Sequence, residues 1–97
     1  MNQVTIGTAD QFDSFPAEIV LDRRPYYLMK EDGAYRLVSR RCPHAGYTVD
    51  IEDGEFVCPM HGWTFETDTG RCHNVPSAML AMYEVIVEDG TLIAILP

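Results

Sequence analysis

Four side chains that commonly bind metals fall in two short segments near the middle of the chain. Residues 42–46 have the sequence CPHAG and residues 58–62 have the sequence CPMHG, so each segment supplies one thiolate and one imidazole. Two thiolates and two imidazoles suit a structural zinc ion, although a Cys-x-His spacing with proline and glycine neighbours is unusual for zinc. Proline and glycine bend and stiffen the backbone where it must approach a buried inorganic group. The sequence therefore predicts a metal site formed by Cys42, His44, Cys58 and His61.

A β-hairpin is expected between the two segments. Val49 and Ile51 precede the tripeptide Glu-Asp-Gly at 52–54, and the apolar residues 56–57 follow it. Asp-Gly between apolar runs is a strong hairpin signal because glycine accepts the positive φ of a tight turn. Such a hairpin brings the bases of the two loops side by side.

The rest of the chain has the pattern of short strands joined by tight turns. Glu-Asp-Gly recurs at 31–33 and 88–90 between apolar runs, which predicts two more hairpins. Helical spacing of apolar residues over eleven or more positions is absent, and one short helical turn is expected from Ala9 to Phe12 with Thr8 as its N-cap. Further strands are expected at Val4–Ile6, Ile19–Leu21 and Trp63–Phe65. The predicted class is all-β, in a single domain spanning residues 1–97.

Composition restricts the possible partners and the cell compartment. Fifteen Asp and Glu residues against seven Lys and Arg give a net charge of −8, which disfavours binding to nucleic acid or to an anionic membrane. An acidic surface instead favours a partner with a basic docking patch. The odd number of cysteines, three, argues against a disulfide framework, and no apolar run is long enough to span a bilayer. A cytoplasmic location is expected.

The two loops resemble those of the Rieske family, whose signature is Cys-x-His on one loop and Cys-x-x-His on another. The resemblance implies one [2Fe–2S] cluster per chain, with Cys42 and Cys58 on one iron and His44 and His61 on the other. It also implies an antiparallel β-sandwich with a small cluster-binding subdomain of two loops at about residues 41–76. The segment Asn74–Ser77 resembles the family's third, proline-containing loop. Colour distinguishes the alternatives, because a cluster protein is brown-red and a zinc protein is colourless.

Comparison with the high-potential branch of the family predicts a low reduction potential. Those members carry an extra cysteine in each loop, which pair as a disulfide, and the matching positions here are Tyr47 and Met60. They also carry Ser and Tyr hydroxyls that bond to sulfur, where this chain has Trp63 and Phe65. Fewer hydrogen bonds to the reduced cluster lower its potential, toward roughly −150 mV.

The histidine count restricts the function. A ring-hydroxylating oxygenase also needs a mononuclear iron on two histidines and a carboxylate, and only His73 of the three histidines remains after the cluster ligands. The chain is therefore predicted to be no enzyme but a ferredoxin that carries electrons from a flavin-dependent reductase to a terminal oxygenase or other redox protein. The alternatives are a small Rieske subunit of a larger reductase complex, such as nitrite reductase, and a detached oxygenase domain acting in trans. Cys72 and His73 are expected to be a buried thiol and a loop imidazole.

Overall fold

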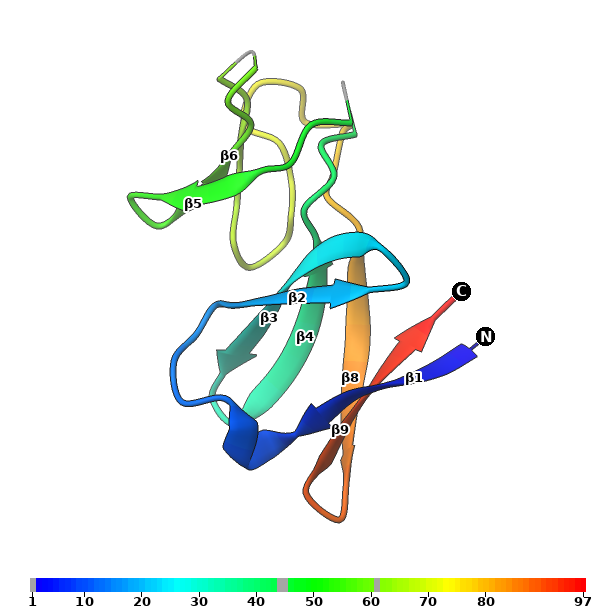
Figure 1. Cartoon of the computed structure of the whole chain (residues 1–97). Coiled ribbons are helices and arrows are strands. Elements are labelled where there is room, and N and C mark those ends of the chain that lie inside the picture. Colours follow the sequence, from blue (N-terminus) through cyan, green and yellow to red (C-terminus); the bar gives the residue numbers. More distant parts are fainter. Residues whose placement is uncertain (1, 44–45, 61) are drawn as a thin grey trace. The chain divides into compact units, whose positions relative to one another are not determined.

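The computed structural model describes residues 2–43, 46–60 and 62–97. Within these ranges the chain forms β-strands and a single turn of 3₁₀ helix (Figure 1). The elements are β1 (Asn2–Thr8), η1 (Ala9–Gln11), β2 (Ala17–Leu21), β3 (Arg24–Glu31), β4 (Ala34–Ser39), β5 (Asp50–Glu52), β6 (Glu55–Val57), β7 (Thr64–Phe65), β8 (Met82–Glu88) and β9 (Thr91–Leu96). The all-β prediction is confirmed. No helix among the described residues is long and apolar enough to cross a membrane.

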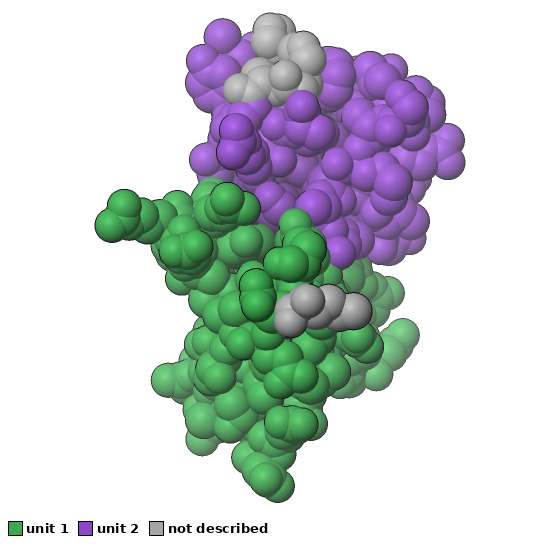
Figure 2. All heavy atoms as spheres, turned by 90° about the vertical axis from the view of Figure 1, so that its right-hand side faces the viewer, with its two compact units in different colours: residues 1–38, 83–97 green, residues 39–82 purple. Residues whose placement is uncertain are grey.

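The chain divides into two compact units, which Figure 2 colours separately. Residues 1–38 and 83–97 form the first unit, and residues 39–82 form the second. The first unit is built on a six-stranded sheet in the order β1-β9-β8-β4-β3-β2. Alternate residues of its strands share one hydrophobic core, as the period of two in a half-buried strand requires. The buried members of that core are Tyr26, Leu28, Leu37, Val85, Leu92 and Ala94.

The second unit contains all of the predicted metal ligands and a three-stranded antiparallel sheet in the order β5-β6-β7. Phe56 on β6 lies opposite Phe65 on β7, and both side chains are fully buried. Burying two phenylalanines contributes about 2–3 kcal/mol each, a large share for so small a sheet. The sheet therefore gives the loops that flank it a fixed base.

Each Glu-Asp-Gly tripeptide forms the hairpin predicted for it. Asp32, Asp53 and Asp89 have φ of 52°, 51° and 50°, and the glycine that follows each has φ near 80°. Two successive residues with positive φ make the turn that matches the twist of the flanking strands. A fourth turn of this kind joins β2 to β3 through Asp22 and Arg23, at φ of 50° and 66°. The sequence did not predict this turn because it contains no glycine.

The remaining local predictions are confirmed with small changes. The strands expected at Val4–Ile6, Ile19–Leu21 and Trp63–Phe65 correspond to β1, β2 and β7. The short helical turn after Thr8 is η1, and the backbone N–H of Thr8 donates to Oε1 of Gln11 at 2.9 Å. That bond satisfies a backbone donor at the start of the helical turn.

Candidate metal centre

The first cysteine loop is closed by a ladder of backbone contacts. The N–H of Val49 donates to the carbonyl of Arg40 at 2.7 Å, and Arg41 forms an antiparallel bridge with Thr48. Inside this ladder the N–H of Cys42 donates to the carbonyl of Tyr47 at 2.8 Å. Cys42 therefore occupies the last paired position before the loop tip.

Two further contacts tighten that loop tip. The N–H of Gly46 donates to the carbonyl of Cys42 at 2.8 Å. Gly46 has φ of +74°, a value that a residue with a Cβ adopts only at a cost. The glycine four residues after the cysteine is thus required by the turn.

The second cysteine loop repeats this geometry. The N–H of Cys58 donates to the carbonyl of Trp63 at 2.8 Å, and the N–H of Gly62 donates to the carbonyl of Cys58 at 2.9 Å. Gly62 has φ of +71°. In both loops the cysteine donates to the residue five positions later and accepts from the glycine four positions later. The two loops also share the sequence pattern Cys-Pro-x-x-Gly-aromatic-Thr, at residues 42–48 and 58–64, which explains why they form the same turn.

The two cysteines have the burial and chemistry expected of cluster ligands. Cys42 is 1% exposed and Cys58 is fully buried, and neither forms a disulfide. The predicted ligands His44 and His61 lie outside the described residues. Within the described ranges no group of three or more His, Cys, Asp and Glu side chains is arranged around a common metal position. The described residues place two buried thiols on two equivalent turns. This arrangement fits a metal group bound from two loops.

Arg40 anchors the base of the first loop. Its Nε donates to the carbonyl of Val49 at 2.9 Å, and its Nη2 lies 2.8 Å from Oδ1 of Asp50. The Arg40 side chain is only 11% exposed, whereas that of Asp50 is 63% exposed. A hydrogen bond from a charged, shielded donor is stronger than a neutral one. Arg40 thus fixes the loop to the start of β5, a contact that the sequence did not predict.

A third turn in the same unit has the same backbone pattern without a cysteine. The N–H of Glu66 donates to the carbonyl of Arg71 at 2.9 Å, and the N–H of Gly70 donates to the carbonyl of Glu66 at 2.9 Å. Gly70 has φ of +78°. The only sequence signal for this turn is a glycine four residues after its first residue. Oε1 of Glu66 instead accepts a hydrogen bond from the Thr69 hydroxyl at 2.5 Å.

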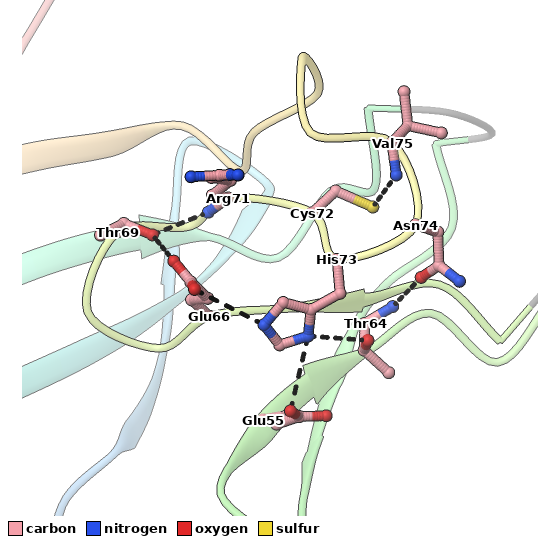
Figure 3. A network of polar contacts seen from close by, with 9 residues as sticks. All are labelled: Glu55, Thr64, Glu66, Thr69, Arg71, Cys72, His73, Asn74 and Val75. Atoms are coloured by element: carbon pink, nitrogen blue, oxygen red, sulfur yellow. Dashed lines mark hydrogen bonds and ion pairs between the residues drawn. The ribbon is translucent and has the colours of Figure 1, made fainter.

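Cys72 and His73 follow this third turn, as Figure 3 shows. Cys72 is fully buried, and its sulfur accepts a hydrogen bond from the N–H of Val75 at 3.4 Å. The His73 ring lies between two carboxylates, with Nδ1 3.5 Å from Oε1 of Glu55 and Nε2 3.6 Å from Oε2 of Glu66. A buried thiol at Cys72 was predicted, whereas the contacts of His73 with two acidic residues were not.

The predicted low potential depends on four residues, Tyr47, Met60, Trp63 and Phe65. Tyr47 and Met60 are 46% and 52% exposed. Phe65 is fully buried and, like Trp63, has no hydroxyl to donate. Neither the disulfide nor the hydroxyl donors of the high-potential members can be formed by these residues.

Comparison with known families identifies the class. The model of the Rieske [2Fe-2S] domain matches residues 2–84. The chain therefore belongs to the Rieske [2Fe–2S] domain family. Members of this class bind a cluster through two cysteines and two histidines and pass one electron at a time.

Related sequences include an oxygenase and a desaturase that are much longer than this chain. The chain is 30% identical over 82 residues to chlorophyllide a oxygenase of Arabidopsis thaliana, covering 80% of this chain and 15% of that protein. It is 37% identical over 54 residues to cholesterol 7-desaturase of Caenorhabditis elegans, covering 50% of this chain and 13% of that protein. The chain thus spans about one seventh of the length of these curated relatives.

Solved structures of small proteins share the fold over their whole length. The ferredoxin of carbazole 1,9a-dioxygenase from Nocardioides aromaticivorans IC177 superimposes with a TM-score of 0.68 at 21% identity, covering 100% of both chains. A Mycobacterium tuberculosis protein assigned as an NADH-dependent nitrite reductase small subunit gives 0.65 at 20% identity, covering 99% of this chain and 96% of that one. The predicted Rieske fold is confirmed.

Proposed function

We propose that this chain is a one-electron carrier with one Rieske [2Fe–2S] cluster, held by Cys42, His44, Cys58 and His61. When bound, the cluster accepts and releases single electrons. The observation that carries the proposal is the pair of equivalent loops, each with a buried cysteine at the same position of the same turn. The two thiolates balance part of the iron charge, and the two imidazoles keep the site less negative than four thiolates would.

The third cysteine provides a matched control for the ligand assignment. Cys42, Cys58 and Cys72 are all buried and free of disulfides, yet only the first two begin the repeated loops. We expect Cys42→Ala and Cys58→Ala to yield colourless protein without the rhombic EPR signal of a reduced Rieske centre. Cys72→Ala is expected to keep two irons per chain and the brown-red colour. Loss of iron in Cys72→Ala alone, with retention in the other two, would contradict the assignment.

We further propose that the carrier works at the low end of the Rieske range, near roughly −150 mV. The support is chemical: Trp63 and Phe65 cannot donate a hydroxyl hydrogen bond, and Tyr47 and Met60 cannot form a disulfide. The reduced cluster therefore receives fewer hydrogen bonds to offset its added negative charge. Voltammetry of the purified protein tests this, and a potential above zero would refute it.

The proposed partners are a flavin-dependent reductase as electron donor and a terminal oxygenase as acceptor, so the chain is an electron-transfer component of a multicomponent system and not itself the enzyme. The ferredoxin similar in fold to this chain along its full length belongs to such a dioxygenase. The net charge of −8 favours docking to basic surfaces on both partners, so electron transfer is expected to slow as ionic strength rises. A rate independent of salt would contradict docking through opposite charges. We also propose a cytoplasmic location, which the odd number of cysteines, three, favours.

A second candidate function is a fixed small subunit of a larger reductase. The likeness in fold to the nitrite reductase small subunit over nearly the whole of both chains favours it. Size-exclusion chromatography of extracts from the native cells separates the two functions. A carrier elutes apart from any larger reductase, whereas a fixed subunit elutes with its complex.

A further inference from the structure

We propose that His73 is a positioning residue for the cluster: its ring lies between Glu55 and Glu66 and so holds the segment after Cys72 against the sheet that leads into the Cys58 loop. This inference rests on the proposed function, because it concerns how firmly the chain retains its cluster. We call this arrangement of His73, Glu55 and Glu66 the histidine latch.

The latch joins three separate parts of the second unit (Figure 3). Glu55 begins β6, Glu66 directly follows β7, and His73 belongs to the segment after the third turn. The two carboxylates face opposite nitrogens of the ring, at 3.5 Å from Nδ1 and 3.6 Å from Nε2. The hydroxyl of Thr64 also lies 3.1 Å from Nδ1. Among the described residues, Glu55 and Glu66 are the charged groups within ion-pair distance of the ring.

Each nitrogen of the His73 ring faces one carboxylate, so the ring is held from two sides. A hydrogen bond between an N–H group and a carboxylate is stronger than one between two neutral groups. Glu55 and Glu66 thus fix the position of His73 and, through it, the segment after Cys72.

Backbone contacts connect the latch to the cysteine loop. The N–H of His73 donates to the carbonyl of Thr64 at 2.8 Å, and the N–H of Thr64 donates to Oδ1 of Asn74 at 3.0 Å. Thr64 on β7 pairs with Val57, the last residue of β6, and the next residue is Cys58. The latch is thus connected through the backbone to the strand pair immediately before a predicted cluster ligand.

The experiment measures the rate at which the holoprotein loses its visible absorption at one fixed pH. His73→Gln keeps a polar side chain but has no ring to place a nitrogen against each of the two carboxylates. We expect it to lose the cluster about three- to tenfold faster than the wild type. This range corresponds to two partly exposed polar contacts. Glu55→Gln and Glu66→Gln are expected to give intermediate acceleration.

Matched controls separate the latch from the general effect of charge. Glu52→Gln and Asp68→Asn remove the same charge from exposed positions on the same hairpin and the same turn. Both are expected to lose the cluster at the wild-type rate. A His73→Gln variant that loses the cluster at the wild-type rate would overturn the proposal. So would equal effects of Glu66→Gln and Asp68→Asn.

A second measurement tests the latch independently of the electron-carrier proposal. Hydrogen–deuterium exchange of the peptide containing residues 71–76 is expected to be faster in His73→Gln than in the wild type at pH 6. Failure of this difference overturns the latch and leaves the ligand assignment intact. Conversely, retention of the cluster after Cys42→Ala and Cys58→Ala overturns the ligand assignment and leaves the exchange result standing.

Discussion

Gly70 is expected to be the glycine of the second unit least tolerant of a side chain. It has φ of +78°, and a Cβ built there lies 2.8 Å from the backbone carbonyl oxygen of Leu80. The N–H of Leu80 also donates to the carbonyl of Gly70 at 2.8 Å, so the two backbones cannot simply separate. Gly54 has almost the same φ, +79°, but its Cβ meets no atom within 4 Å. The two glycines therefore share the conformational cost and differ only in the steric one.

The magnitudes follow from this comparison. Alanine in the left-handed region costs about 1–2 kcal/mol, which is the whole expected effect of Gly54→Ala. Gly70→Ala adds an overpacking term of about 1–3 kcal/mol because the clash is with rigid backbone. The expected loss of free energy of unfolding is thus about 2–5 kcal/mol for Gly70→Ala. At about 4–8 °C per kcal/mol for a domain of this size, the overpacking term should make Gly70→Ala melt about 4–24 °C below Gly54→Ala.

Thermal melting of the holoprotein, followed by circular dichroism at a fixed scan rate, measures this difference. Visible absorption recorded in the same scan reports whether cluster loss coincides with unfolding. Equal melting temperatures for the two variants would refute the reasoning, because the close contact with Leu80 would then carry no energetic weight. A Gly70→Ala variant that does not fold at all agrees with the upper end of the range, provided that Gly54→Ala does fold.

Three other variants test separate parts of the structure. Phe56→Ala removes a fully buried ring and should cost about 3–5 kcal/mol of unfolding free energy in urea titrations, and a cost below 1 kcal/mol would contradict its core position. Arg40→Ala should cost about 1.5–3 kcal/mol, whereas Asp50→Asn, at the exposed end of the pair, should cost less than about 1 kcal/mol; the reverse order would refute the anchoring role of the guanidinium. Burial raises the pKa of Tyr26 above its ordinary 10.0, and the nearby Tyr83 raises this pKa further. The folded state then holds a proton that the unfolded chain loses, so wild-type stability should fall faster than that of Tyr26→Phe as pH rises above 10, and parallel curves would contradict this.

Much of the local structure was predictable because short-range chemistry determines it. The Asp-Gly pairs at 32–33, 53–54 and 89–90 define their turns by the conformations open to two neighbouring residues. The Asp22–Arg23 turn has the same geometry but not the same composition. Arginine has no intrinsic preference for φ of 66°, so pairing of β2 with β3 must hold it there. That turn could only be found in the structure.

The predicted metal site shows the same contrast between what local sequence predicts and what depends on the fold. The candidate ligands Cys42, His44, Cys58 and His61 could be read from the sequence, because thiolate and imidazole are metal-binding groups wherever the chain folds. The contacts of Glu55, Glu66 and His73 could be found in the structure alone, since those residues come from three elements and their mutual distances depend on how β6, β7 and the third turn pack. Chemical identity is a local property of the sequence, whereas proximity between distant residues is a property of the fold.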